Sequence, residues 1–318
     1  MDNSNNNYDI SINKLTATNK KHEKPESTIK HLVCSGGGIN GFIFYSLFKE
    51  TNFKKLWNLK DIETYYGTSV GTIVGALLLL TDSWEDIDNY LIHRPWEHVF
   101  KFDLPTLLNS IDSRGIYNIY HIQTILSPFI LAKEQTIDIT MKQFYELTSV
   151  EFHCILTEIN SHTQIDISYK THPEWKLLDA IYASCALPII FSPLLKDDKC
   201  YADGSIITNC PIEESIKNGA NPDEIMAIYT ITNNETTNIV NEDSNIFDYV
   251  GKIMKRIIHL RTNHVYPEVK YTYKVPGIST SINSIYELAK DKEKRIELLN
   301  SGKKIYISNY NETLNEHN

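Results

Sequence analysis

The chain has 318 residues, 42% of them hydrophobic, which is enough to bury a sizeable core in one large domain or two. Its formal net charge of −9 argues against a broad nucleic-acid surface and against simple attraction to anionic lipid, although a local basic patch stays compatible with it. The five cysteines are odd in number and lack zinc-ligand spacing, so we expect reduced thiols and a cytosol-like compartment.

The N-terminal segment carries no targeting signal that we recognise. Residues 1–28 are rich in Asn, Ser, Thr and Lys and poor in apolar residues, which predicts a flexible leader and no signal peptide. The longest nearly apolar run, residues 70–80, is too short to span a bilayer, so no transmembrane anchor is expected. These features predict a protein that is cytoplasmic or peripheral to a membrane.

A first glycine-rich turn follows a short apolar strand expected at residues 31–34. It contains Gly36, Gly37, Gly38 and Gly41 and leads into the apolar segment 42–48. Glycines let the backbone come close to a bound group, and free N–H groups at a helix start point at negative charge. This loop can therefore supply hydrogen-bond donors to an oxyanion.

A second glycine-rich turn follows the next expected strand, residues 62–66. Gly67, Ser69 and Gly71 form a G-x-S-x-G pattern that opens the helical run 72–80. In a strand–turn–helix context such a serine stands on a tight turn with its hydroxyl exposed. A serine needs a neighbouring base to act as a nucleophile, so the base must come from further along the chain.

The remainder of the chain alternates strands and helices, which predicts an α/β fold with a central, mostly parallel sheet covered by helices on both faces. After an aromatic-rich helical stretch at residues 83–131 we expect a strand hairpin (152–159 and 163–169), a helix (176–185), a short strand (199–202), a helix (212–218), a strand (224–231), an Asn-rich surface loop (233–245) and helices at 246–259 and 284–299. The charged run 291–295 is expected to be a solvated helix face.

Asp203 is the best candidate for the base. It ends a short strand immediately before Gly204, and active-site side chains of α/β sheets converge at strand ends. An Asp-Gly pair alone is more often an ordinary turn.

At this point the chain resembles the patatin-like phospholipases. The resemblance rests on residues 36–41, 67–71 and 183–188 and on Asp203-Gly204 followed by Asn209-Cys210-Pro211, in the family's order and spacing, and it covers roughly residues 31–220. It implies a three-layer patatin-like fold and a Ser–Asp dyad with Ser69 as nucleophile, Asp203 as proton acceptor and an oxyanion hole at Gly36, Gly37 and Gly38. It also implies a lipid or phospholipid substrate met at a membrane surface, with no metal and no cofactor.

Two positions depart from the family's usual pattern. Asn40 stands where the family usually has Arg or Lys, which removes a positive charge beside the oxyanion loop. Ser205 stands where the family usually has Gly or Ala after Asp-Gly.

The motifs are expected to be supported by Gly41, Gly67, Gly71, Gly204 and Asn209. The domains expected on this basis are a leader (1–28), a catalytic domain (29–232) and a mostly helical C-terminal extension (233–318).

Several other interpretations stay open from the sequence. Gly36, Gly38 and Gly41 also satisfy G-x-G-x-x-G, with Glu63 as a ribose-binding carboxylate, which would indicate a dinucleotide site. A lipid-binding or scaffold protein of low turnover on the same fold is the main functional alternative. The late histidines His259, His264 and His317 are expected to lie at the surface, and the His93–His98 spacing does not favour a metal site. The aromatic residues Trp84, Trp96, Phe100 and Phe102 are expected in the core in preference to a lipid-binding lip.

Overall fold

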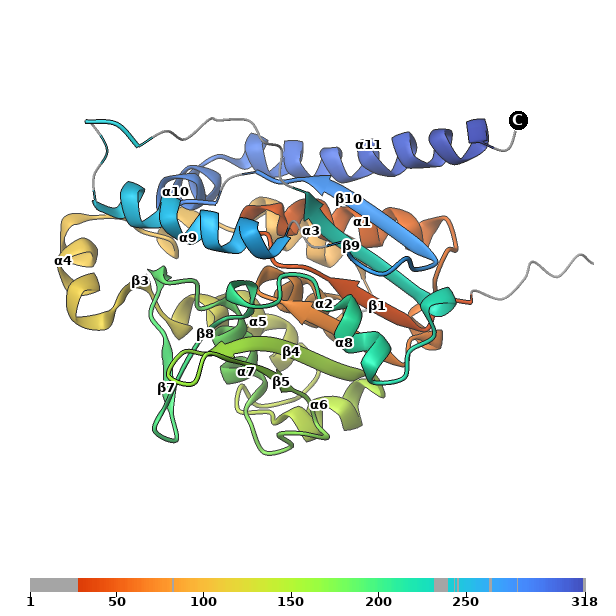
Figure 1. Cartoon of the computed structure of the whole chain (residues 1–318), viewed down its shortest axis with the longest axis horizontal. Helices are drawn as coiled ribbons and strands as arrows, with labels where there is room; N and C mark the ends of the chain where they lie inside the picture. Colours follow the sequence, from red (N-terminus) through yellow and green to blue (C-terminus); the bar gives the residue numbers. More distant parts are fainter. Residues whose placement is uncertain are drawn as a thin grey trace, which may run out of the picture.

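The computed structural model describes residues 28–316 except 82, 232–239, 243, 245, 263–264 and 279 (Figure 1). The expected leader and much of the expected Asn-rich loop therefore lie outside the described residues. The strands are β1 His31–Cys34, β2 Thr64–Thr68, β3 Gly115–Tyr117, β4 Glu151–Glu158, β5 Thr163–Ile167, β6 Ile189–Phe191, β7 Leu194–Lys196, β8 Lys199–Asp203, β9 Ile225–Ile231 and β10 Tyr271–Pro276.

The helices lie on both faces of the large sheet. They are α1 Gly41–Phe53, α2 Val70–Leu80, α3 Trp84–His93, α4 Leu104–Ser113, α5 Ile119–Ala132, α6 Met141–Thr148, α7 Leu177–Cys185, α8 Ile212–Lys217, α9 Ile246–Thr262, α10 Ile282–Lys290 and α11 Lys292–Glu316. None of these described helices combines the length and apolar character needed to cross a bilayer.

The central sheet has the strand order β10-β9-β1-β2-β4-β8-β7, with β5 also pairing with β4. The run from β10 to β4 is parallel, whereas β8, β7 and β5 are antiparallel to their neighbours. The predicted α/β fold with a mostly parallel sheet is confirmed. Because β1 and β2 are parallel neighbours, the two glycine-rich turns that follow them meet at the same edge of the sheet.

Alternating side chains of the strands build the two layers of the core. In β1, Leu32 and Cys34 face the larger core, which is covered by helices that include α1, α2 and α7, whereas Val33 faces a smaller core beneath α8. In β2, Tyr65 packs in the larger core and Tyr66 packs in the smaller one. Successive side chains of a strand point to opposite faces of the sheet. In a central strand covered by helices on both faces, both sets of side chains are therefore buried.

The expected hairpin appears as β4 and β5, and the helices and strands expected near 176–185, 199–202, 212–218 and 224–231 appear as α7, β8, α8 and β9. One strand in the C-terminal region was not expected. Strand β10 pairs in parallel with β9 from Tyr271 to Pro276 and so extends the central sheet. Residues 233–318 therefore contribute to the sheet as well as to the helical layer.

The expected helix at residues 284–299 is interrupted. Helix α10 ends at Lys290, and the Asp291 carboxylate accepts hydrogen bonds from the backbone N–H groups of Glu293 and Lys294 at the start of α11. The expectation of a solvated face was wrong for Arg295, which is buried. Its guanidinium donates to the carbonyls of Leu288 and Ala289 and to that of Ile92, so it caps the ends of α10 and α3.

Candidate active site

Ser69 lies on a strained turn between β2 and α2. Its backbone has φ 53° and ψ −129°, a conformation that an L-residue adopts at a cost of order 1–3 kcal/mol. The turn is closed because the start of α2 packs against the end of β1: a Cβ placed on Gly71 would lie 2.4 Å from the Cys34 carbonyl oxygen. Glycine at this position therefore lets α2 approach the sheet and leaves the serine at the bend.

The Ser69 turn is held in place by a serine from a distant helix. The backbone N–H of Ser69 donates to the Ser184 hydroxyl at 2.9 Å, and that hydroxyl donates to the Ile155 carbonyl of β4 at 2.6 Å. Behind the turn, the Thr72 hydroxyl donates to the Ser69 carbonyl at 2.7 Å. These contacts give a defined role in fixing the position of Ser69 to Ser184, which lies in the motif 183–188 that we expect to be a helix end packed behind the site, and to Thr72, which the sequence did not single out.

Asp203 reaches the same place from the antiparallel strand β8. Strand β5 occupies one edge of β4 at both Ile155 and Leu156, so β2 and β8 share the other edge: Thr68 pairs with Ile155, and Asp203 pairs with the next residue, Leu156. Ser69, which follows Thr68, and Asp203 therefore lie next to each other along the same edge of β4. Asp203 is 1% exposed and Ser69 is 9% exposed, so both lie below the molecular surface.

The surroundings of Asp203 adjust its basicity. Burial raises the pKa of the Asp203 carboxyl to about 6, while a hydrogen bond with the Ser69 hydroxyl and hydrogen bonds from the backbone and hydroxyl of Ser205 moderate the rise in pKa. The Ser205 backbone N–H lies 2.8 Å from the carboxylate oxygen. Such a group is ionised at neutral pH and still basic enough to accept a proton from a serine hydroxyl.

The first glycine turn lies against Ser69. A Cβ placed on Gly36 would lie 3.3 Å from the Ser69 Cβ and 2.3 Å from the Ser205 hydroxyl oxygen. The Gly36 amide differs from the expectation, because its N–H donates to the Asn209 carbonyl at 2.9 Å. The amides of Gly37 and Gly38 donate no hydrogen bond to any described residue, so they are the free donors of this loop.

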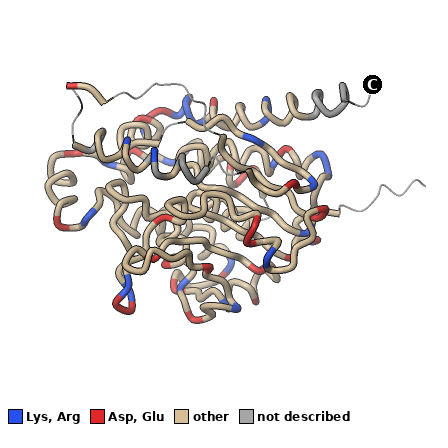
Figure 2. The backbone as a smooth tube through the Cα atoms, viewed as in Figure 1, with Lys and Arg blue, Asp and Glu red and all other residues tan. Residues whose placement is uncertain are grey.

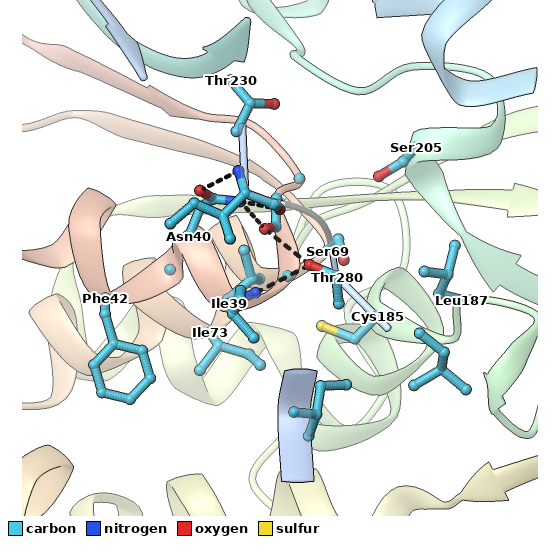
Figure 3. A pocket seen from close by; sticks show the side chains of 18 of the residues that line it. Ile39, Asn40, Phe42, Ser69, Ile73, Cys185, Leu187, Ser205, Thr230 and Thr280 are labelled. Atoms are coloured by element: carbon cyan, nitrogen blue, oxygen red, sulfur yellow. Dashed lines mark hydrogen bonds between the residues drawn. The ribbon is translucent and has the colours of Figure 1, made fainter. Parts of the chain in front are cut away.

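Asn40 ties this loop to the C-terminal part of the chain. Its amide nitrogen donates to the carbonyls of Gly37 at 2.6 Å and Ile278 at 3.1 Å, and its oxygen accepts from the Ile278 N–H at 3.0 Å. The Thr280 hydroxyl donates to the Gly37 carbonyl at 3.4 Å and accepts from the Ile39 N–H at 3.3 Å (Figure 3). The segment that follows β10 therefore braces the glycine loop from outside.

A cavity of about 480 Å³ opens at this loop, within the usual size of a small-molecule site. Gly36 to Gly38, Ser69, Asp203 and Asn209 form its polar part, and Ser69 and Cys185 lie close together in Figure 3. Burial raises the pKa of the Cys185 thiol, so this side chain stays neutral beside the serine. Most of the remaining lining is apolar, from residues that include Phe42, Ile73, Leu77, Trp96, Phe100, Ile122, Leu187 and Phe191.

The four aromatic residues expected in the core differ in how deeply they are buried. Trp96 is buried and Phe100 is partly buried, and both line the cavity. Trp84 packs against the main core, as expected. Phe102 is 40% exposed, so the core expectation was wrong for this residue.

The geometry does not favour the dinucleotide interpretation. Glu63 immediately precedes β2, at the amino end of the strand, whereas Gly36 to Gly38 follow the carboxyl end of β1. The Glu63 carboxylate pairs with Lys30 at 3.5 Å on that opposite edge. A ribose bound near the glycine turn would be out of its reach. His259 lies in α9, while His264 and His317 lie outside the described residues.

The supporting residues lie behind the reactive groups. Gly67 is within β2, Gly71 is in the first turn of α2, and Gly204 begins the short 3-10 turn Gly204–Ile206 directly after Asp203. Gly41 starts α1 and lines the cavity with Asn209. The structure thus brings the predicted site residues to one place, with Gly36 engaged by Asn209 and with Ser184, Ile278 and Thr280 added as supports.

The chain resembles proteins of known sequence and structure. A family model described as patatin-like phospholipase matches residues 32–216. The chain is 26% identical over 218 residues to the probable lipid hydrolase 463L of Invertebrate iridescent virus 6, covering 66% of this chain and 73% of that protein. It is 26% identical over 187 residues to the uncharacterized protein R571 of Acanthamoeba polyphaga mimivirus, covering 59% of this chain and 61% of that one. VipD from Legionella pneumophila aligns with a TM-score of 0.47 at 15% identity, over 87% of this chain and 67% of that chain.

Proposed function

The chain belongs to the patatin-like phospholipase family, and from this premise we propose that it hydrolyses lipid acyl esters through a Ser69–Asp203 dyad. The observation that carries the proposal is the place of these two groups: a serine on a strained turn, hydrogen-bonded to a buried carboxylate, at the polar part of an apolar cavity. A serine hydroxyl is a weak nucleophile until an adjacent base accepts its proton.

In the first half of the reaction the Ser69 oxygen attacks the ester carbonyl carbon while its proton passes to Asp203. The carbonyl oxygen becomes negatively charged and is held by the N–H groups of Gly37 and Gly38, which donate to no other described residue. The bond to the leaving alcohol then breaks, and the protonated Asp203 gives its proton to the alcohol oxygen. Ser69 is left as an acyl ester.

In the second half a water molecule attacks the acyl-enzyme. Asp203 accepts a proton from this water, the same amides hold the second oxyanion, and the fatty acid leaves as Ser69 regains the proton. The proposed steps use groups of this chain and water and need no metal or cofactor. Gly36 has a positioning role because its amide is bonded to Asn209.

The cavity supports a lipid substrate. Its mostly apolar lining suits an acyl chain, and its polar part holds the nucleophile and the free amides where an ester carbonyl would lie. Such a substrate is sparingly soluble, so we propose that the chain meets it at a membrane surface. The acyl ester can belong to a phospholipid or to another lipid, since the same chemistry serves both.

The test is fatty-acid release from phospholipid vesicles by the full chain and by Ser69→Ala, Asp203→Asn and Ser205→Ala. We expect the first two variants to lose at least about 1,000-fold in rate, because each removes a member of a unit that acts together. Ser205→Ala removes one hydroxyl that lowers the pKa of Asp203 but leaves the dyad in place, so at about pH 8 it should keep most of the wild-type rate. Equal rates for wild type and Ser69→Ala, or no release by folded wild type, would favour the scaffold alternative.

A further inference from the structure

We propose that helices α4 and α9 form a membrane-docking face that sets the cavity mouth against a bilayer containing anionic lipid. This inference rests on the proposed lipid substrate and adds to it the surface and the kind of membrane. It is carried by exposed apolar side chains on α9, which lines the cavity, and on α4, whose flanking segments line it, and by two cations of α9 in the lining.

Helix α9 carries apolar and cationic side chains on one exposed face. Ile246, Tyr249 and Ile253 are 64%, 50% and 41% exposed, and their spacing of three and four residues places them on the same side of the helix. Lys252 and Arg256 each follow a member of this set by three residues, so they adjoin the same face, and both line the cavity. The apolar surface of α9 is therefore continuous with the mouth.

The charge of α9 is opposite to that of the whole chain. The net charge of the chain is −9, yet residues 246–262 contain four basic residues, Lys252, Lys255, Arg256 and Arg261, against one acidic residue, Asp248. Figure 2 shows basic positions along this helix. A local cluster of this kind is attracted to an anionic leaflet over a short distance, where each cation contributes about 1 kcal/mol. Two of these residues, Lys252 and Arg256, line the cavity, where a phosphate-bearing head group would lie.

Helix α4 supplies a second, more apolar surface. Leu104, Leu108 and Ile111 are 65%, 60% and 77% exposed and lie four and three residues apart, on one face of the helix. Asp103 caps its start by accepting from the Thr106 N–H at 2.9 Å, so the helix is well defined at its N-terminal end.

The segments on either side of α4 connect it to the cavity. Phe100, four residues before the helix, lines the cavity. Strand β3, directly after it, pairs with β6, whose Ile190 and Phe191 also line the cavity. Figure 1 shows α4 and α9 at the same end of the molecule in this view. Apolar residues presented beside cations are the composition that holds a helix in the interfacial region of a bilayer.

A bilayer fits this face better than a protein partner. A substrate that leaves the membrane must pass from acyl-chain surroundings to the apolar cavity, and a face seated on the bilayer lets it do so without crossing water. Helix α9 and the segments that flank α4 border that path. The occupant that we assign is therefore a phospholipid surface with anionic head groups.

The experiment measures binding of the full chain carrying Ser69→Ala, which removes turnover, to vesicles of phosphatidylcholine alone and of phosphatidylcholine with phosphatidylserine. Lys252→Gln with Arg256→Gln should weaken binding to the anionic vesicles about 20-fold, and added salt should abolish most of this difference. Leu108→Ser with Ile111→Ser should weaken binding about tenfold on both vesicles, because less apolar surface is buried.

The matched controls lie on α11, away from the cavity lining: Lys303→Gln with Lys304→Gln for charge, and Ile307→Ser for an exposed apolar side chain. Both should bind like the parent chain. Variants of α4 or α9 that bind as well as these controls would overturn the proposal, as would a parent chain that binds neither vesicle. Loss of a dimer on changing α4, seen by light scattering, would identify that face as a contact between copies.

Failure of docking is distinguishable from failure of the proposed hydrolysis. The unmodified chain should cleave a short-chain ester dissolved in water through Ser69, with no membrane present. Cleavage of this ester together with absent vesicle binding would overturn only the docking face. Vesicle binding without any ester cleavage would instead support the face and contradict the catalytic proposal.

Discussion

The two glycine-rich turns meet at one edge of the sheet but are held in different ways. The Ser69 turn is closed by its own neighbours, since Gly71 packs on the end of β1 and the Thr72 hydroxyl bonds the Ser69 carbonyl. The Gly36–Gly38 turn is braced by Ile278 and Thr280, about 240 residues later in the chain. The nucleophile is thus encoded mainly by local packing, and the geometry of the donors depends on the end of the sheet that β10 completes.

The two kinds of support match the different requirements of the two turns. The serine turn stores backbone strain, which requires tight neighbouring contacts to maintain it. The donor loop must keep two N–H groups pointing at a charge that exists only during the reaction, so its support determines how well those donors are preorganised. Changes in the first turn should affect folding and activity together, and changes in the second should affect kcat more than stability.

The largest effect is expected from Gly71→Ala, which breaks the local turn. The added Cβ would lie 2.4 Å from the Cys34 carbonyl oxygen and 2.8 Å from that of Ser35, so β1 and α2 must separate. We expect kcat/KM to fall about 100-fold and the free energy of unfolding to drop by about 1–3 kcal/mol. Denaturant unfolding and ester hydrolysis measure the two quantities.

Gly251→Ala is the control for this change, because a Cβ there meets nothing within 4 Å and the residue lies inside α9. Its stability should stay the same or rise by up to about 1 kcal/mol. If Gly71→Ala kept full activity, the close approach of α2 to β1 would not be what holds Ser69.

The next largest effect should come from Asn40→Asp, which breaks the hydrogen bonds between the Gly36–Gly38 turn and the segment that contains Ile278. A carboxylate keeps the shape but loses both donated bonds and faces the Gly37 and Ile278 carbonyl oxygens. We expect kcat to fall at least about tenfold with little change in KM, because the donor loop loosens while the cavity stays. The control is Asn221→Asp, where only the side-chain oxygen accepts a bond, from the Asp223 N–H. A large rise in KM at constant kcat would contradict a positioning role.

Ser184→Ala tests the one distant support of the local turn. It leaves the buried Ser69 N–H and Ile155 carbonyl without their partner, at a cost of about 1–3 kcal/mol in unfolding free energy. We expect kcat to fall less than in Asn40→Asp, because Gly71 and Thr72 still close the turn. Ser215→Ala is the control: this serine is also buried, but its hydroxyl has no hydrogen-bond partner among the described residues. Equal stability losses in both variants would remove the special role of Ser184.

The smallest effect concerns the pH dependence, which Asp203 determines. Burial raises the pKa of Asp203 from 3.8 to about 6, and only the ionised carboxylate accepts the serine proton. The value of kcat/KM should therefore be constant above about pH 6 and fall tenfold per pH unit well below it. The Ser205 hydroxyl lowers this pKa, so Ser205→Ala should move the acid limb to higher pH. An acid limb near pH 4 would contradict the raised pKa of the Asp203 carboxyl.

Much of the serine turn could be predicted from the sequence because its determinants are neighbours. Gly67, Ser69 and Gly71 lie within five residues. The apolar patterns on either side predict the preceding strand and the following helix. Asp203 was reached through its place at a strand end. That it lies beside Ser69, where β8 continues the edge of β4 that β2 leaves, follows from a strand register that no local pattern specifies.

The sequence predicted the glycine motif of residues 36–38 but not the contacts that hold this loop in place. Asn40 stood out only as a missing charge, and two of its three side-chain hydrogen bonds are made with Ile278, about 240 residues away. Strand β10 was not predicted although Tyr273 and Val275 are buried and Lys274 is exposed in the alternation of a strand, because the run is short and ends at Pro276, which suits an edge strand. Arg295 was misassigned for a related reason: a run of charges does not reveal that one member caps two helix ends.

The most direct test of the account is the site at which a fluorophosphonate reacts with the folded wild-type chain. Intact-mass measurement followed by peptide mapping should show one adduct, on the peptide that contains Ser69, formed quickly above about pH 6 and slowly below it. Asp203→Asn should fold and react far more slowly at the same residue. An adduct on another residue, or labelling of Ser69 at the same rate in Asp203→Asn, would contradict the assignment of Ser69 and Asp203 as the catalytic pair.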